Sequence, residues 1–446
     1  MSRFELIIHG GHVVTPSGVL AVDIGVRGGR IAAIGQLAAD QGAESIDATG
    51  LFVLPGIIDT QVHFREPGAT HKEDLETGTR AAVLGGVTGV FEMPNTNPLT
   101  LTEADLAAKF ARARGRAWCD HAFFIGGAAE NADKLHELER IPGCAGVKVF
   151  MGSSTGNLLV EDDTTLERIV RNGTRRMAVH AEDEPRLRER KHIADEAAHP
   201  RAHPAWRDET VCLKATQRLV SLARKYGRRV HVLHVTTAEE MEYLAENKDI
   251  ATVEVTPNHL TLTAPDCYEK LGTKAQMNPP VREARHQNAL WRAIAEGVVD
   301  VVGSDHAPHT LEEKAKAYPG SPSGMPGVQT TLPLLLTAAS RGKLSLERVV
   351  DLLCHGPQRI YQIAGKGRIA RGYDADFTLV DLQAWKTLED KDMGSKVGWT
   401  PFAGMRVCGV PKMTIIRGSA VMRDGELLGA PSGQPIRFAE TISPAS

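Results

Sequence analysis

The stretch GIIDTQVHF at residues 56–64 decides how the chain folds. It is a short apolar run that follows a turn and ends in polar residues, among them His63. A second run, VVDVVGSDHAPH at residues 298–309, has the same form and carries Asp305 near its end. Strands buried on both faces of a parallel sheet are nearly continuous apolar runs. In a (β/α)₈ barrel the chemistry lies at the carboxyl ends of such strands. The two runs therefore predict barrel strands with a site at one end.

Six more runs of this kind lie between these two, and segments of helical periodicity such as residues 101–117 separate them. The runs are GVFEMPN, CDHAFFIGG, GVKVFMG, RMAVHAED, RVHVLHVTT and ATVEVTP. Nearly every run ends in a charged or amide side chain. Since eight strand–helix units make a TIM barrel, we expect an α/β fold with that barrel over residues 55–364.

Both ends of the chain have a different sequence pattern, which is typical of short β-strands. The first fifty residues contain short β-rich stretches separated by Gly, Ser and Pro turns, and GYDADFTLVD followed by MTIIRGSAVMRDGELL resumes that pattern near the C-terminus. A chain of 446 residues exceeds what one hydrophobic core usually serves. We therefore expect residues 1–54 and 365–446 to form a small β-sandwich beside the barrel.

Composition excludes several kinds of partner. The net charge is −3 and there is no basic run, which argues against nucleic acid and anionic membranes as ligands. No apolar run approaches the roughly 20 residues of a membrane span, and the N-terminus does not resemble a signal peptide. The six scattered cysteines form no CxxC pair, as is typical of reduced thiols in the cytoplasm.

Several of the strand-end residues are types that bind metal ions. A His-x-His pair at a strand end places two imidazoles on one side, but here the pair is Gln61-Val62-His63. His180 and His234 end two other runs, although a histidine at a strand end is often a packing residue. Lys148 lies inside an apolar run, where an isolated ammonium is costly. Carbamylation would convert it to an anion able to bridge two metal ions.

Asp305 is a candidate for both metal binding and proton transfer. A carboxylate at this strand end can ligate a metal and accept a proton from metal-bound water. The alternative is an Asp that caps the following loop or helix. Each residue alone leaves the structural alternative open, and the order in which they occur is the stronger signal.

That order, together with four short motifs, resembles the amidohydrolase superfamily along nearly the full chain, and within it the dihydroorotases with a bridging lysine. The motifs are HFREPG at residues 63–68, MPNTNP at 93–98, QMNPPVR at 276–282 and SDHAPH at 304–309. Arg65 separates this group from allantoinases and hydantoinases. A guanidinium pairs with a carboxylate, which dihydroorotate has and the other substrates lack.

The resemblance implies a role for each site residue. His63 and Asp305 would hold one zinc ion, His180 and His234 a second, and carboxylated Lys148 would bridge them. Substrate would be held by the residues Arg65, Asn95 and His309 at its carboxylate and Asn278 at its ring amide. Asp305 would take a proton from the attacking water and return it to the leaving nitrogen. The implied reaction is the reversible hydrolysis of (S)-dihydroorotate to N-carbamoyl-L-aspartate in pyrimidine (UMP) biosynthesis.

Gln61 stands where this family usually has its first histidine, and an amide is a weaker zinc ligand than imidazole. The site could therefore work with one firmly held zinc or with a second, loosely held ion. Two other functions stay open. One is hydrolysis of another cyclic amide, as in allantoinases or hydantoinases. The other is a non-catalytic role as a partner of aspartate transcarbamoylase. Relatives also imply a homodimer or larger homo-oligomer.

Two segments are candidates for closing over the substrate, residues 307–327 and 191–209. The second contains His192, His199 and His203, whose spacing does not suit a metal site, so we expect exposed loop residues there. Asn258 and His259 receive no role.

Overall fold

A barrel of parallel strands forms the larger part of the protein. The computed structural model describes residues 3–154 and 158–441. Eight strands pair in chain order in one sheet. A parallel bridge between Val62 and His306, with the His63 amide donating to the His306 carbonyl at 2.7 Å, brings the first and last strands together. The strands are β8 (Ile57–Val62), β9 (Val87–Glu92), β10 (Asp120–Gly126), β11 (Cys144–Phe150), β12 (Met177–His180), β13 (Val230–Val232), β14 (Ala251–Val255) and β15 (Val301–Val302). The predicted TIM barrel is confirmed.

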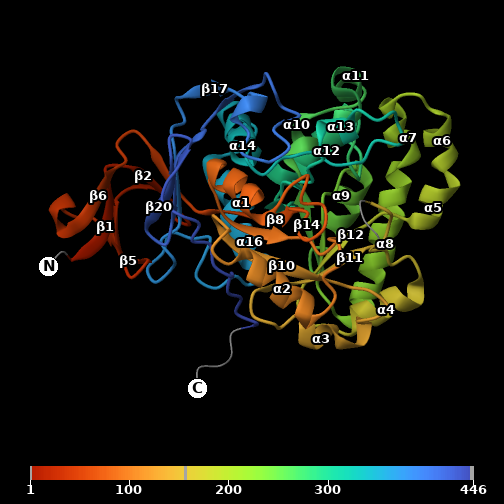
Figure 1. Cartoon of the computed structure of the whole chain (residues 1–446), viewed down its shortest axis with the longest axis horizontal. Coiled ribbons are helices and arrows are strands. Elements are labelled where there is room, and N and C mark those ends of the chain that lie inside the picture. The colour runs from red at the N-terminus through yellow and green to blue at the C-terminus, as the bar shows by residue number, and fades with distance from the viewer. Residues whose placement is uncertain (1–2, 155–157, 442–446) are drawn as a thin grey trace.

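Helices cover the outside of the barrel (Figure 1). Local sequence explains their limits. In α8, for example, the Asp208 side chain accepts from the Val211 amide, and Gly227, at φ 66°, ends the helix in the left-handed conformation that glycine tolerates. The helices are α1 (Leu75–Leu84), α2 (Glu103–Ala113), α3 (Leu135–Leu138), α4 (Asp163–Arg171), α5 (Glu184–Glu189), α6 (Lys191–Glu196), α7 (His203–Trp206), α8 (Glu209–Tyr226), α9 (Ala238–Ala245), α10 (Pro257–Thr261), α11 (Asp266–Leu271), α12 (Ala284–Ala295), α13 (Leu311–Lys314), α14 (Thr331–Ser340), α15 (Leu346–Val350) and α16 (Gly356–Tyr361).

Strands from both ends of the chain form a β-sandwich beside the barrel, at the left of Figure 1. One sheet has the order β5-β4-β1-β6 and the other β21-β20-β19-β16-β7-β2-β3. Side chains such as Ile24, Val53 and Phe377 form its buried core. The strands are β1 (Phe4–His9), β2 (His12–Thr15), β3 (Gly18–Ala21), β4 (Asp23–Arg27), β5 (Arg30–Gly35), β6 (Gly42–Asp47), β7 (Phe52–Pro55), β16 (Phe377–Val380), β19 (Pro411–Ile416), β20 (Ser419–Arg423) and β21 (Glu426–Leu427). The sandwich is confirmed, and its exact boundaries stay a prediction.

Part of the C-terminal region packs on the barrel itself. The hairpin of β17 (Trp385–Thr387) and β18 (Arg406–Cys408) interrupts the sandwich sequence. Within it Trp399 is fully buried, and its indole N–H donates to the His309 carbonyl at 2.9 Å. This segment therefore supports the loop that follows β15.

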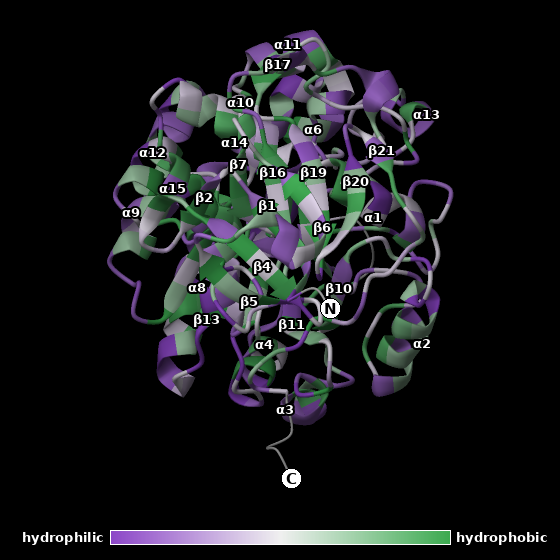
Figure 2. Ribbon diagram, turned by 90° about the vertical axis from the view of Figure 1, so that its left-hand side faces the viewer, coloured by the Kyte–Doolittle hydropathy of each residue, from purple (hydrophilic) through white to green (hydrophobic). Residues whose placement is uncertain are grey.

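Hydrophobic residues concentrate on the strands at the centre of Figure 2, whereas peripheral helices such as α2 carry both hydrophobic and hydrophilic residues. This is the pattern of elements that bury one face. Among the described residues there is no helix long and apolar enough to cross a membrane. All six cysteines are buried and free.

Candidate active site

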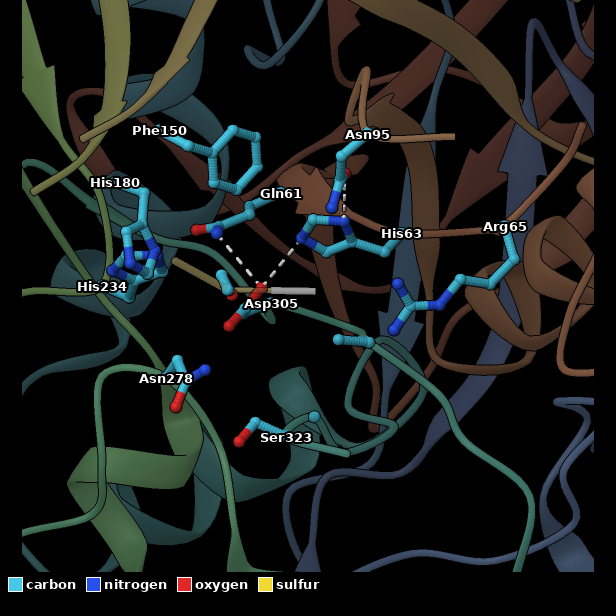
Figure 3. A pocket seen from close by; sticks show the side chains of 13 residues that line it. Gln61, His63, Arg65, Asn95, Phe150, His180, His234, Asn278, Asp305 and Ser323 are labelled. Carbon is cyan, nitrogen blue, oxygen red and sulfur yellow. Dashed lines mark hydrogen bonds and ion pairs between the residues drawn. The ribbon is translucent and has the colours of Figure 1, made fainter. Parts of the chain in front are cut away.

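The polar residues that end the barrel strands line one pocket (Figure 3). The carboxyl ends of parallel strands meet at the same rim, so side chains far apart in the sequence converge there. The lining residues are Gln61, His63, Arg65, Asn95, Phe150, Ser154, His180, His234, Asn278, Asp305, Ala307, Ser323 and Gly324. Lys148, on β11, lies fully buried outside this lining.

Two imidazoles face each other on one side of the pocket. Nδ1 of His180 and Nε2 of His234 are 3.0 Å apart. His180 donates through Nε2 to the Glu182 carboxylate at 2.8 Å. Burial lowers the pKa of both histidines, so both rings are neutral and His180 Nδ1 carries a lone pair. The Nδ1 atom of His234 has no partner among the described residues. Neutral imidazoles held by a carboxylate are typical of metal ligands.

His63 and Asp305 meet near the centre of the pocket in Figure 3. His63 Nε2 is 3.3 Å from Asp305 Oδ1, and His63 Nδ1 is 2.9 Å from Asn95 Oδ1. The same Asp305 oxygen accepts from Gln61 Nε2 at 3.1 Å (Figure 3). Asp305 has φ 47°, a left-handed backbone conformation that is uncommon for a residue with a side chain. The fold thus holds this carboxylate in one orientation, toward Gln61 and His63.

Lys148 is fully buried, and its Nζ has no hydrogen-bond partner among the described residues. Burial lowers its pKa to about 7. The centroid of the Phe150 ring lies 4.4 Å from Nζ. Glu254, from β14, is also buried, and burial raises its pKa to about 8. Lys148 is therefore an amine without a counter-ion, which a carbamate would convert into a ligand.

These groups fit a divalent metal ion. Within residues 3–154 and 158–441, no three His, Cys, Asp or Glu side chains by themselves form a metal-binding group. The convergence of His180 and His234 and the unpartnered Nζ of Lys148 are what such a site requires. On the other side, Gln61 turns its amide nitrogen, which is not a metal ligand, toward Asp305.

Cationic and amide donors line the outer part of the pocket. Arg65 is buried, and its guanidinium points into the pocket below His63 in Figure 3. Its Nη2 lies 3.3 Å from Nε2 of His309. Asn278 stands on the far side of the pocket from Arg65, and its Oδ1 accepts from His203 Nε2 at 2.9 Å. This bond leaves the Asn278 amide N–H groups to face a ligand.

The segment at residues 191–209 is not the exposed loop that the sequence predicted. It contains α6 and α7, and His203 is fully buried because it packs beside Tyr318 and binds Asn278. His192 is exposed, as expected. The prediction for His203 failed because its burial arises from contacts remote in sequence.

Sequence reasoning also missed the support behind His180. Glu182 is buried and accepts from Arg207 Nε at 3.1 Å and Nη2 at 2.5 Å, as well as from His180. Burial raises the pKa of Glu182, but the charge of Arg207 and the hydrogen bond from His180 outweigh this effect and hold the pKa below its usual range. A carboxylate two residues after a strand-end histidine, as in HAED, was a signal that could have identified it.

Known proteins resemble this chain over nearly its whole length. A model of the Amidohydrolase family matches residues 52–421. The dihydroorotase of Halobacterium salinarum is 39% identical and the alignment covers 93% of this chain and 96% of that protein. The dihydroorotase of Methanothermobacter thermautotrophicus is 36% identical, with 92% and 93% covered.

Relatives named for other activities also align over nearly the whole chain, at lower identity. An allantoinase of Desulfitobacterium hafniense is 33% identical, and 98% of this chain and 99% of that protein are covered. Among solved structures, the L-hydantoinase (dihydropyrimidinase) from Arthrobacter aurescens is 30% identical with a TM-score of 0.92, covering 97% of this chain and 100% of that one.

Proposed function

The chain belongs to the amidohydrolase family, and we propose that it is a dihydroorotase, which reversibly hydrolyses (S)-dihydroorotate to N-carbamoyl-L-aspartate in pyrimidine (UMP) biosynthesis. The observation that carries this proposal is the buried pair of Arg65, which lines the pocket, and His309, which lies 3.3 Å behind it and outside the lining. A guanidinium beside a second donor suits the carboxylate that dihydroorotate adds to its ring. The archaeal dihydroorotases among its relatives support the same reaction.

The proposal includes a zinc site. His180 and His234 would hold one ion, and His63 and Asp305 would contribute to a second position, with carboxylated Lys148 between them. A bound zinc ion supplies Lewis acidity, which lowers the pKa of water toward ~7 and polarises a carbonyl. Gln61 weakens the second position because its amide nitrogen, not its oxygen, faces Asp305.

The chain's own residues bind the substrate and move the proton. Arg65 and His309 would hold the carboxylate together with Asn95, whose Oδ1 also orients the ring of His63. Asn278 would donate its amide N–H to the substrate ring, since His203 holds its oxygen. Asp305 lies between the two groups of residues and would accept a proton from water at its carboxylate and deliver it to the ring nitrogen that leaves.

The test compares three cyclic amides as substrates of purified protein in zinc and bicarbonate, namely L-dihydroorotate, allantoin and hydantoin. We expect turnover of dihydroorotate above the other two. Arg65→Met should lower kcat/KM for dihydroorotate about 100-fold or more, because truncating one partner of a buried charge pair costs ~2–5 kcal/mol. Arg190→Met, which removes an arginine that forms an ion pair with Asp208 at 3.3 Å, is the matched control.

Preferential turnover of allantoin or hydantoin would replace the proposal with the second candidate, which the allantoinase and hydantoinase relatives favour. A folded, zinc-loaded protein without turnover of any of the three would instead favour a non-catalytic partner of aspartate transcarbamoylase.

Location and assembly complete the proposal. Six buried, free thiols support a reducing cytoplasm. Val19 and Leu20 are exposed on β3, the end strand of the seven-stranded sheet, and such an edge favours pairing with another chain. We propose a homodimer or larger homo-oligomer, which light scattering would reveal as a mass above that of one chain.

A further inference from the structure

We infer that Lys72 is a positioning residue that keeps His309 in the tautomer that donates a hydrogen bond to the substrate carboxylate. The inference rests on the proposed function, since it concerns the site where that carboxylate would bind. Lys72 does not line the pocket. It acts through the ring of His309, from the side away from the ligand.

The contacts fix which nitrogen of His309 accepts. Lys72 Nζ lies 3.1 Å from His309 Nδ1 and 3.0 Å from Glu313 Oε1. An ammonium group has donors only. His309 Nδ1 must therefore offer its lone pair to Lys72, and Glu313 holds the ammonium in place. The side chain of Lys72 is only 13% exposed, so water competes little for this bond.

The other nitrogen of His309 then carries the proton. Burial, with the nearby charges of Arg65 and Lys72, lowers the pKa of His309 well below its usual value, so the ring is neutral. Its Nε2–H points to the Ser323 carbonyl at 3.0 Å and lies 3.3 Å from Arg65 Nη2. Arginine nitrogens also only donate. Two donors thus stand side by side without bonding each other, and a carboxylate that takes the place of the Ser323 carbonyl can accept from both.

The opposite tautomer of His309 would prevent Arg65 and His309 from donating together to a carboxylate. With the proton on Nδ1, which lies 3.6 Å from Glu313 Oε2, the Nε2 lone pair would accept from Arg65 Nη2. The guanidinium and the imidazole would then satisfy each other, and a lone pair would face the incoming carboxylate. Lys72 excludes this state because a protonated Nδ1 would oppose its ammonium donors.

The first arm of the test is kinetic. Lys72→Met removes the donor, and we expect KM for L-dihydroorotate to rise about 10- to 100-fold, the usual effect of losing one hydrogen bond to a charged group. The inhibition constant of dihydrouracil, which has the same ring without the carboxylate, should stay within a factor of about three. Lys72→Arg keeps a donor and should restore most of the affinity.

The matched control is Lys396→Met. Lys396 is a neighbouring lysine that donates to the Thr70 carbonyl at 2.8 Å and pairs with Asp74, without contact to His309. It removes the same charge from the same region and should leave KM unchanged. An equal loss in both variants, or an equal loss for dihydrouracil, would overturn the inference in favour of a general charge or structural effect.

The second arm needs no turnover. Protein labelled with ¹⁵N in histidine is compared by NMR for wild type and Lys72→Met in zinc-loaded form, with His309→Asn identifying the His309 signals. We expect the protonated nitrogen to be Nε2 in wild type and to shift toward Nδ1 in the variant. An Nδ1–H tautomer in wild type, or no change in the variant, would overturn the inference. Failure of wild type to hydrolyse dihydroorotate would overturn the proposed function only.

Discussion

Gln61 places an amide nitrogen 3.1 Å from Asp305 Oδ1, next to His63. The amide oxygen is buried and has no hydrogen-bond partner among the described residues. A neutral N–H group beside the carboxylate takes over part of the stabilisation that a cation would give. The residue therefore ties the orientation of Asp305 to an internal hydrogen bond and makes it less dependent on a metal at this position.

We expect Gln61→His to raise the metal content of the protein. Imidazole nitrogen is a zinc ligand that the amide nitrogen is not, so the variant should retain more zinc per chain after dialysis against a weak chelator, as measured by plasma mass spectrometry. Gln61→Asn keeps an amide and serves as the control. Equal zinc in wild type and Gln61→His would show that Gln61 already contributes a ligand.

Two buried lysines should differ in their reaction with carbon dioxide. Burial lowers the pKa of Lys148 and of Lys314 to about 7 in both cases. Lys314 Nζ donates to three carbonyls, those of Gln276, Pro322 and Gly324, at 2.8–3.1 Å. In contrast, Lys148 Nζ has no hydrogen-bond partner among the described residues. Of these two lysines, Lys148 is therefore the one free to form a carbamate.

The measurement is ¹³C NMR in ¹³C-bicarbonate with zinc. We expect one carbamate signal in wild type and none in Lys148→Met, in which Lys314 remains. A signal that persists in Lys148→Met would place the carbamate on another amine and remove Lys148 from the proposed ligands.

At the scale of elements, the segment that contains α6 and α7 contacts both the proposed substrate-binding residues and the proposed metal-binding residues of the pocket. From it His203 binds Asn278 at 2.9 Å, and Arg207 binds Glu182, which in turn holds His180. Arg207 also donates to the Ser153 carbonyl at 2.5 Å. One short stretch of chain thus orients side chains of both groups.

Arg207→Met should weaken zinc binding about 10- to 100-fold, the typical effect of losing a group that orients a metal-ligating histidine. Without Arg207, the buried Glu182 loses the partner that holds its carboxylate in place, and the His180 ring bonded to it loses its fixed orientation. Competition with a chromophoric chelator gives the zinc dissociation constant. Arg190 lies directly before this segment, and Arg190→Met should change the dissociation constant little. Equal affinities in the two variants would contradict the role of Arg207.

The same segment shows what sequence could and could not predict. The barrel strands were identifiable because burial on both faces leaves continuous apolar runs, and the ligand types at their ends, such as His180 and Asp305, pointed to one rim. Fold and family are confirmed by the sheet order and the relatives. The helices α6 and α7 are too short for a periodic pattern, and the bond from His203 to Asn278 spans residues far apart in the chain. The roles of individual site residues stay proposals.

For the whole molecule, a buried ionic cluster joins the sandwich to the barrel. Lys366 Nζ lies 2.6 Å from Asp120, which begins β10, and 2.5 Å from Asp376, which precedes β16. Asp374 is 3.3 Å away, and Arg417 pairs with Asp120 at 2.5 Å. This cluster sits at the amino ends of the barrel strands, opposite the pocket, where side chains of such barrels serve stability.

Lys366→Met should destabilise the protein strongly and leave its chemistry intact. The variant leaves buried carboxylates without their shared cation. Removing one partner of a buried pair costs ~3–5 kcal/mol. We expect the melting temperature by calorimetry to fall by several degrees, with KM and zinc content near the wild-type values at 25 °C. Lys412→Met, which removes a surface lysine 3.5 Å from Asp424, should change the melting temperature by less than about one degree, because such exposed pairs contribute little.

If the two variants had the same melting temperature, the sandwich and the barrel would be held by their apolar contacts, and the cluster would only fix their register. If Lys366→Met instead lost zinc or substrate affinity at an unchanged melting temperature, the ionic cluster around Lys366 would affect the geometry of the pocket through the barrel strands.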